Sequence, residues 1–318
     1  MRTTKSLGAA VLAALLVLAS TSTAAPAASA AAPLPVPWTL LAALPAQAAN
    51  PGGPPPGAND FSCRPSTAHP NPVVLAHGLG ANQTVNWQTY SPLLKNNGYC
   101  VFSLTYGVPG APLPIYQPAG LLPMEQSAAE LGAFVDRVLA ATGASKVDIL
   151  GHSEGTLMPS YYVKFLGGAS KVDKYVSLTP LWDGTTLFGV SSLYDLSKLI
   201  GLDAGINGAL DPVCGSCRQF LHGSDFLAKL HSGNGVFQPG VQYTNILTRY
   251  DEAVTPYTSG LGSGPNVRNI VLQDSCLLDL SEHGGLAADR NAAGHVLNAL
   301  DPAHPHPVPC VPATVLGS

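Results

Sequence analysis

The chain has 318 residues, enough for one or two domains, and a formal net charge of −4. Charged residues make up 11% of it and apolar residues 46%. We therefore expect an unusually apolar surface, which suits a protein acting on apolar substrates and equally an ordinary exported hydrolase. The acidic balance, without a basic cluster, argues against nucleic acid as a partner and against electrostatic docking to anionic lipid.

The first 24 residues have the pattern of a secretory signal peptide. A basic end at residues 1–5 is followed by an apolar run at 7–19 and then by small residues that include Ser22-Thr23-Ala24. The apolar run is too short to span a bilayer. We therefore predict a signal peptide at 1–24, a secreted, extracellular protein, and no integral membrane span once the signal is removed.

The next segment, residues 25–57, is rich in Ala and Pro and ends in a run of Pro and Gly at 51–57. Such a composition cannot bury a core, so we predict a linker or pro-region. The short apolar stretch 38–44 lies inside it, and cleavage after residue 48 remains an alternative. The globular part is expected at 58–318, the size of a single α/β domain.

Six cysteines follow the predicted signal, and an even number in an exported chain implies disulfides. Fifteen pairings are possible. Proximity in sequence favours Cys63–Cys100, Cys214–Cys217 and Cys276–Cys310. Zinc is the rival interpretation of the C-x-x-C motif, but no second pair at ligand spacing accompanies it, so we expect no metal.

The first predicted strand, residues 72–76, runs into His77-Gly78-Leu79-Gly80-Ala81-Asn82. The apolar run predicts a buried parallel strand, and the glycines predict a tight loop at its C-terminal end. The active crevice of an open parallel sheet lies at such ends. A glycine loop there can direct backbone N–H groups at a developing oxyanion, although an ordinary strand-to-helix turn is the alternative.

Strands and helices then alternate along the chain, as their apolar periodicity indicates. The strands are expected at 72–76, 99–106, 147–150, 172–179, 242–250 and 269–274, and the helices at 84–97, 124–142, 154–165 and 286–300. This order predicts an α/β fold with a mostly parallel, doubly wound sheet. Residues 181–237 interrupt the alternation, and we predict a helical cap or lid insertion there; an ordinary helical excursion packed on the core is the alternative.

The strand at 147–150 leads into Gly151-His152-Ser153-Glu154-Gly155, a match to G-x-S-x-G, and a helix is expected directly after it. A sharp strand-to-helix turn needs small residues two positions before and after its apex. The apex serine is then exposed at a helix N-terminus, where developing negative charge is favoured. A chance match to the G-x-S-x-G pattern is the alternative, but the expected strand before it and the expected helix after it favour the serine turn.

A serine nucleophile needs a histidine base oriented by a carboxylate, and on such a sheet they follow in the order Ser, acid, His. His283 follows the last strand in a glycine-flanked loop, so we predict it as the base. Asp251 ends the preceding strand and is the predicted acid. The other late histidines lie in the insertion, a helix or the tail: His222, His231, His295, His304 and His306.

Other acids and earlier histidines have weaker positions. His77 and His152 precede or adjoin the serine and are expected to shape their loops. The rival acids are Asp274, Asp279, Glu252 and Asp225. The predicted oxyanion donors are the backbone N–H groups of Leu79 and Glu154; the Glu154 carboxylate would oppose the developing charge unless it turns away or is paired.

Together, these motifs resemble the secreted actinobacterial class-2 lipases and esterases of the α/β-hydrolase superfamily, over about residues 72–300. The resemblance implies hydrolysis of triacylglycerols or simpler carboxylic esters, lipid degradation, and no cofactor. It implies the roles given above for Ser153, Asp251, His283, Leu79 and Glu154. Many relatives carry Met or Gln at position 154.

A lipid or small ester substrate, contact with a lipid–water interface and a monomeric state are therefore expected. A polyester hydrolase or an acyltransferase using the same triad is the alternative within enzymes. A non-catalytic secreted binding protein is the alternative from another class, and the presence of all three triad positions argues against it.

Overall fold

The computed structural model describes residues 1, 32–110, 116–187, 205, 208 and 211–318. Residues 34–318 form one compact unit. The predicted signal peptide, apart from Met1, lies outside the described residues, as does part of the predicted cap, at 188–204, 206–207 and 209–210.

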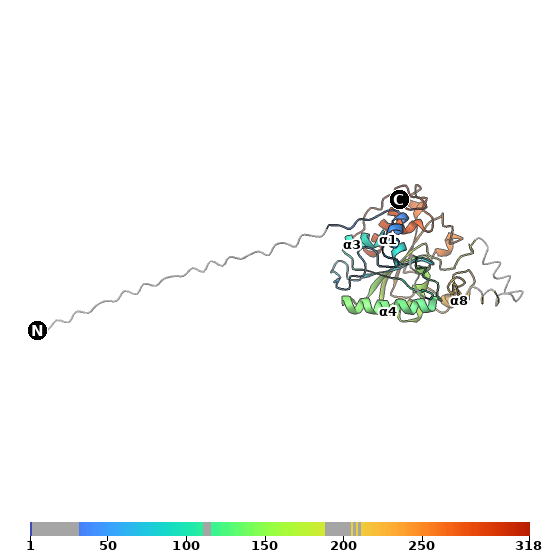
Figure 1. The fold of residues 1–318 in the computed structure, drawn as a ribbon, viewed down its shortest axis with the longest axis horizontal. Helices are drawn as coiled ribbons and strands as arrows, with labels where there is room; N and C mark the ends of the chain where they lie inside the picture. Colours follow the sequence, from blue (N-terminus) through green and yellow to red (C-terminus); the bar gives the residue numbers. More distant parts are fainter. Residues whose placement is uncertain (2–31, 111–115, 188–204, 206–207, 209–210) are drawn as a thin grey trace. The chain divides into compact units, whose positions relative to one another are not determined.

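Among the described residues, six parallel strands form the central sheet, in the order β2-β1-β3-β4-β5-β6. Their bounds are β1 Val73–Ala76, β2 Val101–Leu104, β3 Val147–His152, β4 Val172–Leu178, β5 Gln242–Leu247 and β6 Val267–Val271. Figure 1 shows helix α4 (Met124–Thr142) on one side of the sheet and α3 (Tyr90–Asn96) on the other. The chain adds β2 on one side of β1 and then returns to add β3 on the other. Ala76 is therefore paired with Gly151, and the loops after β1 and β3 leave the sheet side by side at its switch point. The predicted doubly wound α/β fold is confirmed.

Apolar layers cover both faces of the sheet, because successive side chains of a strand point to opposite faces. In β1, Val74 and Ala76 contact one layer, and Val73 and Leu75 the other. Helices α4 (Met124–Thr142) and α5 (Glu154–Phe165) contribute to the first layer. Helices α3 (Tyr90–Asn96) and α10 (Arg290–Leu300) contribute to the second.

Two predicted helices are divided in the structure. The expected helix at 84–97 forms α2 (Gln83–Asn86) and α3, because Pro92 has no N–H and its ring would collide with the carbonyl four residues earlier in a continuous helix. The expected helix at 286–300 is a 3₁₀ turn, Gly285–Ala288, followed by α10. Asp289 separates them by accepting the N–H of Ala292 at 2.7 Å as an N-cap.

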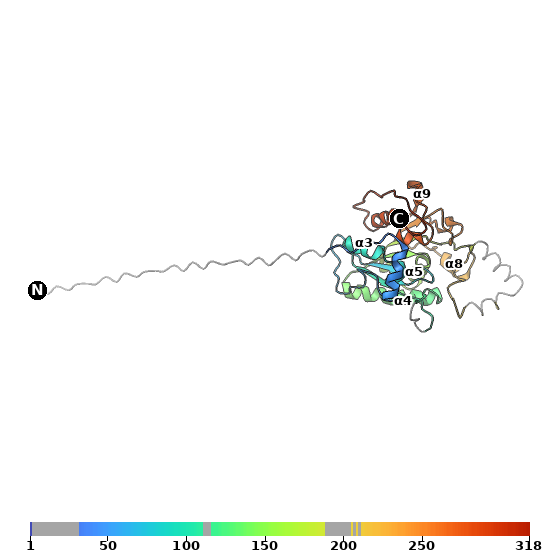
Figure 2. The same cartoon turned by 45° about the horizontal axis from the view of Figure 1, so that its top comes forward.

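The second half of the predicted linker differs from expectation, since it belongs to the compact unit. It forms a 3₁₀ turn, Leu40–Ala42, and α1 (Ala43–Ala49), which packs against α2 (Figure 2). Trp38 packs on the core layer of α3 and α10, and the guanidinium of Arg290 lies 5.0 Å from its ring centroid. The apolar stretch at 38–44 thus finds a partner surface that composition alone does not reveal.

Three disulfides join Cys63 to Cys100, Cys214 to Cys217 and Cys276 to Cys310, the pairs favoured from the sequence. The Cys214–Cys217 loop packs beside α4: Gly215 donates to the carbonyl of Leu121 at 2.7 Å, and Ser216 Oγ to that of Gly120 at 2.6 Å. The described remainder of the predicted cap also contains helix α8 (Asp225–His231).

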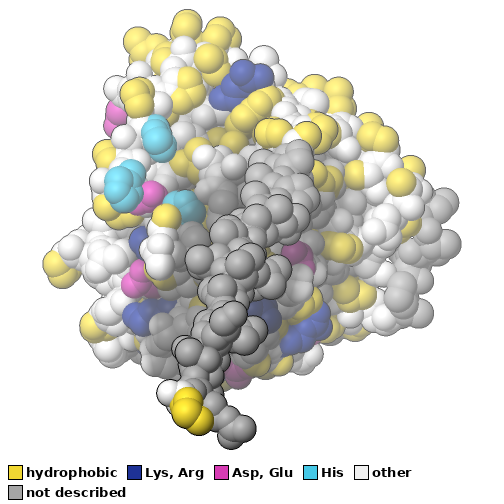
Figure 3. All heavy atoms as spheres, turned by 90° about the vertical axis from the view of Figure 1, so that its left-hand side faces the viewer, with side chains coloured by type: hydrophobic (Ala, Val, Ile, Leu, Met, Phe, Trp, Pro, Cys, Tyr) yellow, Lys and Arg dark blue, Asp and Glu magenta, His cyan; other side chains and the backbone are white. Residues whose placement is uncertain are grey.

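The surface carries many apolar side chains, as the face in Figure 3 shows. The most exposed large ones include Leu44, Val213 and Leu277. In the part of the chain that the structure describes, no helix is both long and apolar enough to cross a membrane.

Candidate active site

Ser153 is the apex of a tight turn between β3 and α5, with φ 56° and ψ −124°. This is a strained conformation for a residue with a side chain. The flanking glycines make the turn possible: a Cβ on Gly151 would lie 2.0 Å from the carbonyl oxygen of Gly155, and one on Gly155 would lie 2.0 Å from that of Ala76. The backbone crossing therefore requires glycine at both positions.

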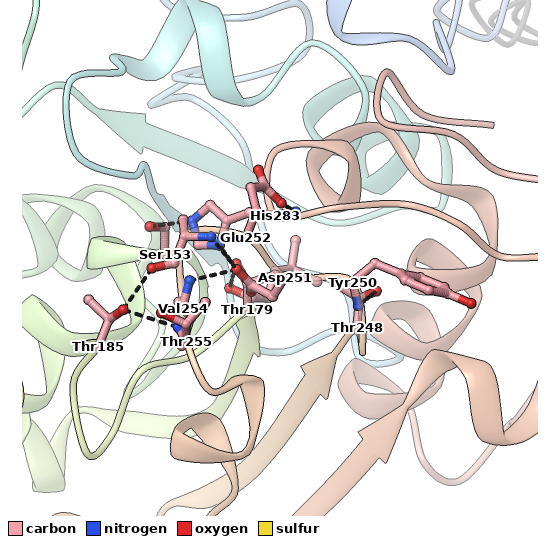
Figure 4. Close-up of polar contacts among 12 residues, drawn as sticks. Ser153, Thr179, Thr185, Thr248, Tyr250, Asp251, Glu252, Val254, Thr255 and His283 are labelled. Carbon is pink, nitrogen blue, oxygen red and sulfur yellow. Dashed lines mark hydrogen bonds and ion pairs between the residues drawn. The ribbon is translucent and has the colours of Figure 1, made fainter. Parts of the chain in front are cut away.

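The structure brings Ser153, His283 and Asp251 together from loops that follow three different strands (Figure 4). His283 Nε2 lies 2.7 Å from Ser153 Oγ, and its Nδ1 lies 2.9 and 3.0 Å from the two carboxylate oxygens of Asp251. The N–H groups of Ala253 and Val254 donate to Asp251 Oδ1 at 3.0 and 2.7 Å. This arrangement can hold a neutral imidazole with its Nε2 lone pair facing the serine hydroxyl.

Glu252 and Thr185 support this arrangement, and neither contact was anticipated from the sequence. Glu252 was considered as a rival acid; instead its Oε2 accepts the backbone N–H of His283 at 3.1 Å. Thr185 Oγ1 donates to the carbonyl of Ala253 at 2.8 Å and accepts the N–H of Thr255 at 3.0 Å. Both contacts hold the acid turn and the histidine loop in place, and both depend on loops that only the fold brings together.

His152 bridges the histidine loop and the glycine loop. Its Nε2 lies 3.0 Å from the carbonyl oxygen of His283, and its Nδ1 lies 3.0 Å from Asn86 Oδ1, which also accepts the N–H of Gly78 at 3.0 Å. Burial, together with the neighbouring His283, lowers the pKa of His152 to about 3. The ring is therefore neutral and carries a single N–H, so it donates to only one of these two oxygens while lying against both. It thereby connects the base loop to the loop after β1.

The loop after β1 lies directly against the nucleophile, since a Cβ on Gly78 would be 3.1 Å from Cβ of Ser153. Within this loop, Gly80 donates its N–H to the carbonyl of Ala119 at 2.8 Å. Leu79 lies between Gly78 and Gly80, beside the serine. Glu154 is the first residue of α5, where the N–H groups have no partner within the helix.

The side chain of Glu154 is 1% exposed, and neither carboxyl oxygen has a hydrogen-bond partner among the described residues. It occupies space left by a glycine: a Cβ on Gly120 would lie 2.6 Å from Glu154 Oε2. Burial raises the pKa of Glu154 well above its ordinary value. Burial without a partner thus favours the uncharged carboxyl, which weakens the repulsion considered from the sequence.

The remaining candidates lie elsewhere or have structural contacts. Asp274 forms an ion pair with Arg249, and Asp279 accepts from Ser281 and Asn291. His231 contacts the carbonyl of Trp182, His304 contacts Asp301, and His295 lies within α10. Within the described ranges, no group of three or more His, Cys, Asp or Glu side chains is placed to hold a metal.

The model of the class 2 lipase family matches residues 70–289. Lipase B of Aspergillus fumigatus has a similar structure, with a TM-score of 0.56 and 18% identity over 80% of this chain; the match spans 61% of that protein. Mature Bacillus licheniformis lipase BlEst2 is 15% identical over 70% of this chain and 90% of its own, with a TM-score of 0.46. The monoacylglycerol lipase of Paleococcus ferrophilus is 18% identical over 63% of this chain and 85% of its own, with a TM-score of 0.44.

Proposed function

Because the chain belongs to the class 2 lipase family of carboxylic ester hydrolases, we propose that it is a secreted serine lipase or esterase. The observation that carries the proposal is the contact of His283 with both Ser153 and Asp251, at 2.7 and 2.9 Å. Its substrates are triacylglycerols or simpler carboxylic esters, and it acts as a monomer at or near a lipid–water interface.

In the proposed reaction, Ser153 Oγ attacks the ester carbonyl while His283 Nε2 takes the hydroxyl proton. The Asp251 carboxylate orients the imidazole and stabilises the imidazolium that forms. The N–H groups of Leu79 and Glu154 bind the oxyanion of the tetrahedral intermediate. His283 then protonates the leaving alcohol, and water activated by the same base releases the acid from the acyl-enzyme.

Secretion is supported by the three disulfides, since such bonds form and persist in oxidising compartments. The predicted signal peptide at 1–24 belongs to the same proposal. Detection of the protein in the culture medium, with its N-terminus determined by sequencing, tests both.

Hydrolysis of p-nitrophenyl butyrate by the wild type and by Ser153→Ala tests the mechanism. We expect kcat to fall by more than about 10³-fold in Ser153→Ala, because the hydroxyl is the attacking group. Ser170→Ala, which removes an exposed hydroxyl bonded to the carbonyl of Gly167, is the matched control. Unchanged turnover in Ser153→Ala would refute the proposed nucleophile.

A further inference from the structure

An apolar groove lies between α1, α2 and Tyr116. Its volume is about 400 Å³, and its lining residues are Leu40, Ala43, Leu44, Gln47, Ala48, Val85 and Tyr116. None of these seven side chains carries a charge, and the single amide among them, Gln47, accepts a hydrogen bond from Asn82 Nδ2 at 3.2 Å. A groove of this composition offers a ligand apolar contact and almost no hydrogen bonding.

The groove is tied to the glycine loop of the site by two hydrogen bonds. The hydroxyl of Tyr116 donates to the carbonyl of Gly80. On the other wall, Asn82 Nδ2 donates to the side chain of Gln47. Asn82 also caps α2, because its Oδ1 accepts the N–H of Val85 at 2.9 Å. The groove therefore opens beside the loop that carries Leu79.

This position is within reach of the nucleophile. Gly78 lies against Ser153, and Gly80 is two residues further along the chain. Because two residues span at most about 7 Å, the carbonyl of Gly80 that Tyr116 contacts lies no more than roughly 15 Å from the serine. A long acyl chain on the serine covers that whole range, and a butyryl group covers only the nearest part of it.

We propose that this groove binds an alkyl chain of the ester substrate. The proposal rests on the proposed function, and the occupant follows from the lack of charge in the lining and from the hydrogen bond that joins Tyr116 to the glycine loop of the site. The chain belongs either to the acyl group under attack or to a second acyl group of the same glyceride. The N-terminal segment that resembled a linker in the sequence thereby becomes one wall of a substrate site.

Two variants on neighbouring residues of α1 test the groove. Ala48 and Ala49 are both exposed, but only Ala48 lines the groove. Ala48→Phe fills the groove while keeping it apolar, and Ala49→Phe is the matched control. If the acyl group under attack occupies the groove, kcat/KM for p-nitrophenyl laurate should fall at least tenfold in Ala48→Phe alone, since each methylene left in water costs about fourfold. For p-nitrophenyl butyrate, Ala49→Phe should match the wild type, and Ala48→Phe should lose less activity than on the substrates with longer chains.

Glycerides distinguish the two sources of the chain. If the acyl group under attack occupies the groove, Ala48→Phe impairs p-nitrophenyl laurate. If a second acyl group does so, p-nitrophenyl laurate is hydrolysed normally and trioctanoylglycerol is impaired relative to methyl octanoate. Equal behaviour of Ala48→Phe and Ala49→Phe on all of these substrates would overturn the proposal, while wild-type butyrate hydrolysis reports separately on the proposed function.

A second pair of variants separates chain binding from adsorption to an emulsion. Leu41 and Leu44 are both exposed, at 52% and 68%, but only Leu44 lines the groove. We expect Leu44→Asp to impair hydrolysis of dissolved long-chain monomeric esters and Leu41→Asp to leave it unchanged. If both impair only emulsified substrates, and to the same extent, the groove binds no chain.

Discussion

Ionisation of Glu154 should limit activity at alkaline pH, and Glu154→Gln should remove that limit. Burial raises the pKa of this carboxyl well above its ordinary value. We therefore expect the native protein to keep the proton at neutral pH and to lose it as the pH rises through the raised pKa. Glutamine has nearly the same shape and stays neutral throughout. We therefore expect the wild type and Glu154→Gln to have similar kcat/KM at neutral pH and to diverge above it.

The size of the effect follows from the position of the carboxyl. A Cβ on Gly120 would lie 2.6 Å from Glu154 Oε2 and 3.4 Å from Cα of Leu79, so an oxyanion bound by the N–H of Leu79 lies no more than about 10 Å from this oxygen. Two negative charges about 10 Å apart repel by about 1.7 kcal/mol at an effective dielectric constant of 20. That energy corresponds to roughly a 15-fold loss of rate when the carboxylate forms.

The assay is kcat/KM for p-nitrophenyl butyrate, corrected for spontaneous hydrolysis, across the neutral and alkaline range. Asp136→Asn, which removes an exposed carboxylate from α4, is the control for loss of charge alone. Identical alkaline profiles for the wild type and Glu154→Gln would refute the reasoning.

The pH dependence of the free energy of unfolding gives an independent measure of the protonation of Glu154. An exposed glutamate ionises near pH 4.5, so above that pH the native state binds one proton more than the unfolded chain. The free energy of unfolding of the wild type should therefore fall, relative to Glu154→Gln, by about 1.4 kcal/mol per pH unit until the buried carboxyl ionises. Parallel curves for the two proteins would show that the buried group is already ionised.

Two further predictions concern positioning and stability. His152→Ala or Asn86→Ala should lower kcat about fivefold with little change in KM, since losing one hydrogen bond costs about 1 kcal/mol. The double variant should lose little more. A rise in KM at constant kcat would contradict the bridge. Replacing Cys276 and Cys310 by Ser should lower the free energy of unfolding by about 4 kcal/mol, because the unfolded chain regains the entropy of a loop whose ends are 34 residues apart. A urea midpoint equal to that of the wild type would contradict this.

Local signals predicted the elements that depend on local chemistry. Helix α4 has the expected bounds, Met124–Thr142, because its apolar residues recur at helical spacing and Gly143 ends it with φ 74°. The turn at Ser153 was predictable from two glycines, and His283 from its place after the last strand. These features need only a few neighbouring residues to be specified.

Features that depend on distant segments could not be predicted. The contact between His152 and the carbonyl of His283 joins residues 131 positions apart. The packing of Trp38 needs a surface built from α3 and α10, so composition alone favoured a linker there. Burial of Glu154 requires the separate loop that contains Gly120, and no pattern in the sequence around Glu154 indicates that burial.

The crossing at Gly155 has a consequence for protein engineering. Its closest approach to the first strand is to the backbone of Ala76, so the distance between the nucleophile and the glycine loop is fixed by main-chain atoms. A library that varies core side chains beneath the sheet can therefore change stability while keeping the reacting groups in register. Positions 151 and 155 should stay fixed in such a library, and the groove beside α1 offers a place to vary substrate range.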